Sequence, residues 1–347
     1  MAMEAQLSCI DASFLYLETP ETPMHVAGYT LFELPKNFEG SFYQHFRKFF
    51  ESRLHTIPIF SKKLAPSLLD LDHPGWVDDP NIDLDYHLRE TTLAAPGTEA
   101  QLEEVIARLH ANLLDRSRPL WQFYVINGLA DGRAALYSKV HHAAVDGGAG
   151  MAINKALYDV TEKPRAVEPP PPKPAPAVAP ASPVAVDPVQ GVSNIVANMV
   201  QQQFKMWQTA TELTTSMTKA FLNQAGSGQA PQGLALMQKL ATELPKLGAP
   251  KTPFNATITR ERTYAARSIS LNDAKAAAKA TGAKLNDVVL AICGGALRRY
   301  LAEKGQLPDK PLIAGVPISL REPGDTRQNN QVSGMLCQIG TDIADPV

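Results

Sequence analysis

A pair of histidines followed by an Asp-Gly step is the feature of this sequence with the most chemical potential. Residues 141–147 read His-His-Ala-Ala-Val-Asp-Gly and follow a strand-like run over 134–140. Histidine titrates near neutral pH, so one imidazole can take a proton from a hydroxyl or amine and return it to a leaving group in the same turnover. These residues therefore suit general base catalysis of acyl transfer without a covalent enzyme intermediate.

Only one of the two histidines can face a given site, because successive side chains of a strand point to opposite faces. His142 shares a face with Val140, whereas His141 shares the other face with Lys139. The residues alone leave open which ring does the chemistry, and a lone histidine at a strand end is most often structural. Asp146 is expected to hold the shape of the loop. Gly147 allows a ligand to approach a helix N-terminus, where backbone donors are free.

The elements that must position these residues form an α/β pattern. Apolar runs predict buried strands over 24–34 and 311–318, and a hairpin of strands over 120–126 and 133–142. Helical spacing predicts helices over 42–54, 99–114 and 287–303, and a short helix over 151–158 follows the glycine-rich residues 147–150. A strand over 262–269 precedes a helix that begins at Ser270, with Asp273 completing a capping box, and ends at Gly282.

A proline-rich stretch predicts where the chain divides. Ten prolines fall within 164–188, which excludes a helix or a central strand there. We expect an N-terminal domain over 1–163, a linker over 164–190, connecting amphipathic helices over 191–250 and a C-terminal domain over 251–347. The apolar stripe over 191–222 indicates a helix packed across the two domains; the alternative is a surface that docks on lipid.

Composition excludes several classes of protein. A formal net charge of −2 argues against a nucleic-acid surface, and no run of 18 apolar residues exists. The three cysteines are too few and too far apart for a disulfide framework or a zinc site, so we expect no metal and a cytoplasmic location. No serine-hydrolase elbow, Walker loop or dinucleotide fingerprint is present.

Several short motifs, in the right order, resemble those of one family. They are His141 to Gly147, Pro23-Met24-His25-Val26, Pro119-Leu120-Trp121, Asn286-Asp287, Pro317-Ile318-Ser319-Leu320-Arg321 and Asn330-Gln331-Val332-Ser333. The chain is similar to the bacterial wax ester synthase/diacylglycerol acyltransferases, within the acyltransferases of the chloramphenicol acetyltransferase-like fold. This resemblance implies a two-domain α/β fold with mixed sheets flanked by helices and an active-site tunnel between the domains. Members continue beyond the last motif, so the second domain is expected to be incomplete.

The resemblance also implies roles for individual residues. His142 would be the general base, with His141 and Asp146 as supports. Asn286 is equally suited to capping a helix and to the active site, and Trp121 either contacts substrate or begins a strand in the core. Arg321 would meet a phosphate of coenzyme A or tie down a loop. The substrate-binding set implied by the motifs is Gly147, Asn286, Asp287, Ser319, Arg321, Asn330, Ser333 and Trp121.

The implied reaction transfers a long-chain acyl group from acyl-CoA to a fatty alcohol or diacylglycerol, with acyl-CoA as a substrate and no cofactor. Alternatives are a condensation enzyme that uses carrier-bound substrates and a non-catalytic lipid-binding protein on the same fold. We expect a cytoplasmic protein that can attach peripherally to the inner membrane or to lipid droplets, and the sequence leaves a homodimer open.

Overall fold

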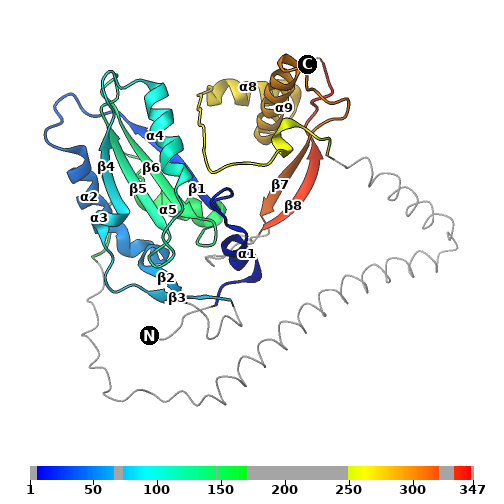
Figure 1. Cartoon of the computed structure of the whole chain (residues 1–347). Helices are drawn as coiled ribbons and strands as arrows, with labels where there is room; N and C mark the ends of the chain where they lie inside the picture. Colours follow the sequence, from blue (N-terminus) through cyan, green and yellow to red (C-terminus); the bar gives the residue numbers. More distant parts are fainter. Residues whose placement is uncertain are drawn as a thin grey trace, which may run out of the picture. The chain divides into compact units, whose positions relative to one another are not determined.

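A computed structural model describes residues 6–65, 73–145, 147–161, 163–169, 249–319 and 332–344. The described residues form two units (Figure 1). The first contains the described residues up to 169 together with Ile258–Arg267, Ser319 and Val332, and the second contains the described parts of 249–257, 268–318 and 333–344. Most of the predicted linker and all but the last residues of the predicted connecting segment 191–250 lie outside the described residues.

A mixed four-stranded sheet is the centre of the first unit. Its strands are β1 (His25–Phe32), β4 (Leu88–Thr92), β5 (Trp121–Asn127) and β6 (Ala134–His141), in the order β1-β6-β5-β4. The pairs β1–β6 and β5–β6 are antiparallel, and β4–β5 is parallel. The predicted hairpin is therefore confirmed. A separate two-stranded sheet pairs β2 (Lys62–Ala65) with β3 (Gly75–Asp78).

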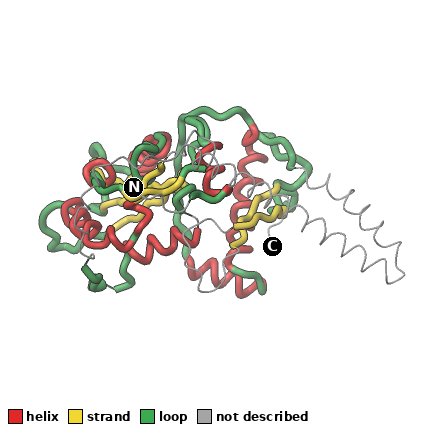
Figure 2. Tube along the Cα trace, turned by 90° about the horizontal axis from the view of Figure 1, so that it is seen from below, coloured by secondary structure: helices red, strands yellow, loops and turns green. Residues whose placement is uncertain are grey.

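Helices cover both faces of the four-stranded sheet (Figure 2). On one face, α4 (Glu99–Ala111) packs on Ile126, Ala135 and Tyr137. On the other, α2 (Phe42–Arg53) and α5 (Gly147–Leu157) enclose a larger core around Phe123 and Val125. The first unit also contains α1 (Cys9–Leu17), α3 (Leu84–His87) and the 3-10 turns Leu54–Thr56 and Pro58–Ser61. The mixed sheet between helices agrees with the predicted fold class.

The second unit contains two helices and a strand pair. They are α8 (Leu271–Thr281), α9 (Leu285–Glu303), β7 (Ile313–Ser319) and β8 (Val332–Gln338), and a 3-10 turn over Pro253–Asn255 precedes them. The Ser270 hydroxyl caps α8 by accepting from the Asp273 N–H, and Gly282 ends the helix with a φ of 68°. Both predicted ends of this helix are confirmed. No helix in the described part of the chain is long and apolar enough to cross a membrane.

Three sequence predictions of strands need correction. The strand predicted over 24–34 forms, but it lies at the sheet edge, and all its residues except His25 are exposed or half-buried. Residues 262–269 form no strand, because the Ala266 N–H bonds to the Glu103 carboxylate instead of to a neighbouring strand. The strand over 311–318 forms as β7, but its residues 313–316 are exposed or half-buried in a sheet of only two strands.

Candidate active site

Pairing of β1 with β6 brings two of the sequence motifs together. His25 lies opposite His141 in the register of this pair. The ladder extends one step beyond the strand, because the His142 N–H donates to the Met24 carbonyl oxygen at 2.8 Å. The histidine pair therefore stands where β6 ends, beside the segment that leads into β1.

His141 is fully buried, and its ring holds the turn that follows. Nδ1 accepts a hydrogen bond from the Ala143 N–H at 3.0 Å. An accepting Nδ1 leaves Nε2 as the protonated nitrogen of a neutral ring. Nε2 lies 3.3 Å from Oε1 of Glu18, close to the carboxylate but not aligned as a hydrogen bond. These contacts suit the supporting role that the family resemblance implies for His141.

Glu18 supports the turn from the other side, and the sequence analysis missed it. Its side chain is only 1% exposed, and it accepts from the Met24 N–H at 3.0 Å and from Nη2 of Arg116 at 2.9 Å. Burial by itself would raise the pKa of Glu18. The interactions with His141, Met24 and Arg116 together outweigh burial and lower the pKa to about 2. A buried, ionised carboxylate therefore fixes the start of β1 relative to His141.

His142 lies in the turn and is half-buried. Its ring stacks on Phe14 of α1, with ring centroids 4.1 Å apart and planes 14° from parallel. Helix α1 packs through Leu15 on Leu114, Leu120 and Ala143. Helix α1 thus supplies the Phe14 ring that orients His142, and Glu18 follows directly after the helix.

A second buried polar group lies on the sheet face under α4. Nζ of Lys139 donates to the carbonyl oxygens of Leu109 and Asn112, at 3.0 and 2.7 Å, which satisfies the C-terminal end of α4. Burial lowers the pKa of Lys139 to about 8. Burial, and after it the charge of Lys139, lowers the pKa of His25 to about 3. His25 is therefore neutral, with Nε2 bonded to the His110 carbonyl oxygen at 2.8 Å.

The structure places the remaining predicted residues in several environments. Gly147 begins α5, and Asp146 lies outside the described residues. Trp121 is 1% exposed, its indole N–H bonds to the Phe60 carbonyl oxygen at 2.9 Å, and its ring stacks on His87. Trp121 therefore has the core position that was the second of its two expected roles, and its substrate contact stays a prediction.

The structure describes some of the predicted residues from the second half of the chain. Asn286 lies inside α9 rather than capping it, since Lys284 precedes the helix and its N–H donates to Asp287 at 2.9 Å. The Asp287 carboxylate thus caps the N-terminus of α9. Ser319 ends β7 and Ser333 lies within β8, whereas Arg321 and Asn330 lie outside the described residues.

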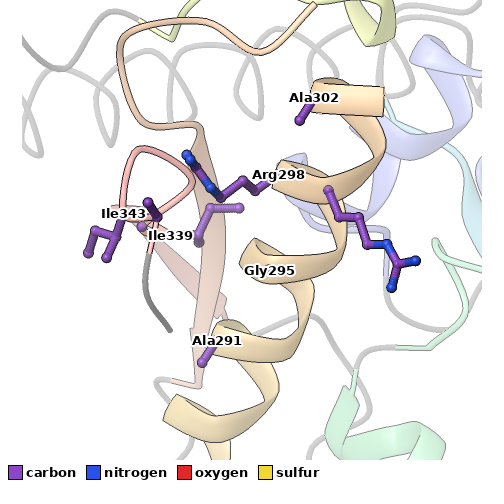
Figure 3. A pocket seen from close by; sticks show the side chains of 9 residues that line it. Ala291, Gly295, Arg298, Ala302, Ile339 and Ile343 are labelled. Atoms are coloured by element: carbon purple, nitrogen blue, oxygen red, sulfur yellow. The ribbon is translucent and has the colours of Figure 1, made fainter. Parts of the chain in front are cut away.

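Each unit contains a cavity. In the first unit, a cavity of about 380 Å³ lies between β1 and α5 and reaches Val140 and Val145, on either side of the histidine pair in sequence. In the second, a cavity of about 370 Å³ lies between α9 and the segment after β8 (Figure 3). There Arg298 extends from α9 and donates to the Thr341 carbonyl oxygen at 2.6 Å. In the described residues, no three His, Cys, Asp or Glu side chains are grouped to hold a metal.

Comparison with known proteins gives consistent matches along the chain. The model of the wax ester synthase/diacylglycerol acyltransferase catalytic domain matches residues 7–289. A Mycobacterium tuberculosis (strain CDC 1551) protein named as a diacylglycerol O-acyltransferase is 37% identical over 354 residues, covering 98% of this chain and 70% of the relative. Another from this species, "Probable diacyglycerol O-acyltransferase tgs2", is 37% identical over 340 residues, covering 97% and 69%.

A solved structure agrees with these relatives. The wax ester synthase/diacylglycerol acyltransferase from Marinobacter aquaeolei VT8 superimposes with a TM-score of 0.62 at 29% identity. The match covers 98% of this chain and 67% of that protein. The similarity therefore runs through both halves of the chain, and the histidine pair lies within the matched catalytic domain.

Proposed function

Because the chain belongs to the wax ester synthase/diacylglycerol acyltransferase family, we propose that it transfers a long-chain acyl group from acyl-CoA to a fatty alcohol or diacylglycerol. The products are a wax ester or a triacylglycerol. No cofactor takes part, and acyl-CoA is a substrate. The observation that carries this proposal is a family-type histidine pair at the end of β6. Glu18 and the segment before β1 hold this pair in place.

In the proposed reaction, His142 takes the proton from the acceptor hydroxyl while the hydroxyl oxygen attacks the thioester carbonyl carbon. The tetrahedral intermediate carries a negative oxygen, which needs hydrogen-bond donors. Its collapse breaks the carbon–sulfur bond, and protonated His142 returns the proton to the departing sulfur of coenzyme A. The hydrogen bond from the Ala143 N–H to Nδ1 of His141 fixes the turn in which His142 lies.

The test of this function follows both products. The protein is incubated with palmitoyl-CoA and either hexadecanol or dipalmitoylglycerol, while free thiol and new ester are measured together. We expect equal amounts of thiol and ester, and no burst of thiol before an acceptor is added, because no acyl-enzyme forms. Absence of ester with both acceptors, or a stoichiometric burst without acceptor, would contradict the proposal.

Attachment to a lipid surface is a separate part of the proposal. Fatty alcohols, diacylglycerols and both products are poorly soluble in water, so an enzyme that acts on them benefits from a peripheral place on the inner membrane or on lipid droplets. The apolar stripe over 191–222 is the proposed contact, and it lies outside the described residues. Flotation with phospholipid vesicles should decrease when Phe204 and Trp207 are both changed to glutamate; unchanged flotation would argue against this contact. A homodimer also remains a proposal, which sedimentation can test.

A further inference from the structure

The cavity between β1 and α5 has the size of a ligand site. Its volume of about 380 Å³ falls within the range common for small-molecule pockets, roughly 300–1,000 Å³. It lies on the sheet face opposite α4, between the sheet and α5. Its apolar lining comes from Val26, Phe123, Val140, Val145, Ile153 and Leu157.

Two pairs of polar groups in the cavity wall bond within the protein, and Asn154 adds a further polar side chain to the wall. The hydroxyls of Thr30 and Tyr158 lie 3.1 Å apart, and the Ser138 hydroxyl donates to the Gly28 carbonyl oxygen at 3.3 Å. These groups need no partner from a ligand. These bonded groups would not be left unpaired beside an alkyl chain, and the apolar side chains of the wall offer it contacts.

The cavity runs along β1, away from the histidine pair. Val26 pairs with Val140, two residues before His142, and Thr30 marks the far end where it meets Tyr158. At a rise of about 3.3 Å per residue, the four steps from Val26 to Thr30 span about 13 Å. An alkyl chain whose reactive end is at His142 would extend along this direction.

Gly28 lies midway along the cavity. Its register partner is Ser138, so a side chain at position 28 would share the cavity face with Ser138. A Cβ built on Gly28 meets no heavy atom within 4 Å, and the same is true of Gly150 on the opposite wall. The backbone of Gly28 lies in a regular strand without a positive φ, so a larger residue fits there without strain.

We propose that this cavity binds the alkyl chain of a substrate and that the missing side chain at Gly28 sets how long a chain fits. This inference rests on the proposed acyl transfer. A side chain at position 28 closes the cavity after two of its four strand steps, or about 7 Å. Long chains then lose contacts that short chains never make.

The test compares chain lengths in the Gly28→Val and Gly28→Leu variants. In one series palmitoyl-CoA and octanoyl-CoA are compared with hexadecanol fixed; in the other, hexadecanol and octanol are compared with palmitoyl-CoA fixed. Misfitting even one methylene changes kcat/KM by about 10- to 200-fold. We therefore expect the long-to-short ratio to fall at least about tenfold in one series, with the larger fall for leucine. A fall in the acyl-CoA series would identify the bound chain as the acyl chain, and a fall in the alcohol series would identify it as the alcohol chain.

The control is Gly315→Val, which adds the same side chain at an open position of a strand in the second unit. Its ratios should match those of the unchanged protein. Unchanged ratios in both series for both Gly28 variants would overturn the inference while leaving acyl transfer intact. If the unchanged protein transfers no acyl group, the proposed function fails separately. Chain binding is then measured by equilibrium dialysis of radiolabelled palmitate and hexadecanol, and equal retention by Gly28→Leu and the unchanged protein would overturn the inference.

Discussion

Replacing Glu18 with glutamine tests the electrostatics that hold the histidine turn. Glutamine keeps the size and one oxygen acceptor of the side chain but removes the charge that faces Arg116 and His141. The pKa of Glu18 is lowered from 4.5 to about 2 in the folded chain. At 1.36 kcal/mol per pKa unit, the ionised carboxylate contributes about 3 kcal/mol to folding at pH 7.

The sign of the pH dependence follows from this lowered pKa. The contribution is fully present above the unfolded pKa of about 4.5 and is lost as the pH falls toward 2, so about 2 kcal/mol disappears between pH 7 and pH 3. Urea unfolding of both proteins across this range gives the difference directly. The Glu39→Gln variant, at an exposed glutamate, is the matched control and should show little change. A Glu18→Gln protein as stable as the original at pH 7, or a difference that stays constant down to pH 3, would refute the reasoning.

Three further variants test other parts of the first unit. Arg53→Met should lower the free energy of unfolding by at least about 2 kcal/mol in urea titrations, because the carbonyl oxygens of Ala156 and Arg165 lose buried donors; no change would contradict the assigned bonds. The unchanged protein should gain stability relative to Lys139→Met as the pH rises from 8 to 10.5, because the Lys139 ammonium loses its proton at a lower pH in the folded chain than in the unfolded chain. A stability difference that does not change over this pH range would contradict the lowered pKa. Gly97→Ala should lower the melting temperature strongly. The φ of 75° costs an L-residue about 1–2 kcal/mol, and the new Cβ would lie 1.9 Å from the Gly128 carbonyl oxygen. A melting temperature equal to the original would contradict this geometry.

Much of the fold could be predicted from the sequence because its signals are local. Helical spacing located α2 and α4, turn-forming residues marked the hairpin of β5 and β6, and Ser270 and Gly282 marked both ends of α8. The order of the strands is not local. The strand over 24–34 looks buried because it is apolar, yet its place at the sheet edge depends on which strands pair with it.

The candidate site also contains residues that a local sequence pattern reveals and residues that it does not reveal. The histidine pair could be found because two adjacent histidines and an Asp-Gly step form a recognisable string. Glu18 could not, because it follows an apolar helix and its importance comes from His141 and from Arg116, which is 98 residues away. Trp121 belongs to a recognisable motif, but its motif position does not distinguish a buried core residue from a substrate contact. The predicted domain boundaries and the predicted tunnel between the domains stay predictions.

The central claim is that His142 carries the proton between the acceptor hydroxyl and the sulfur of coenzyme A. Its most direct test is the rate of thiol release from palmitoyl-CoA with hexadecanol for His142→Ala, with His45→Ala at an exposed histidine of α2 as the control. General base catalysis is worth about a hundred- to ten-thousandfold, so His142→Ala should lose activity by that factor while the control keeps it. Equal rates for His142→Ala and the unchanged protein, with both folded, would contradict the claim.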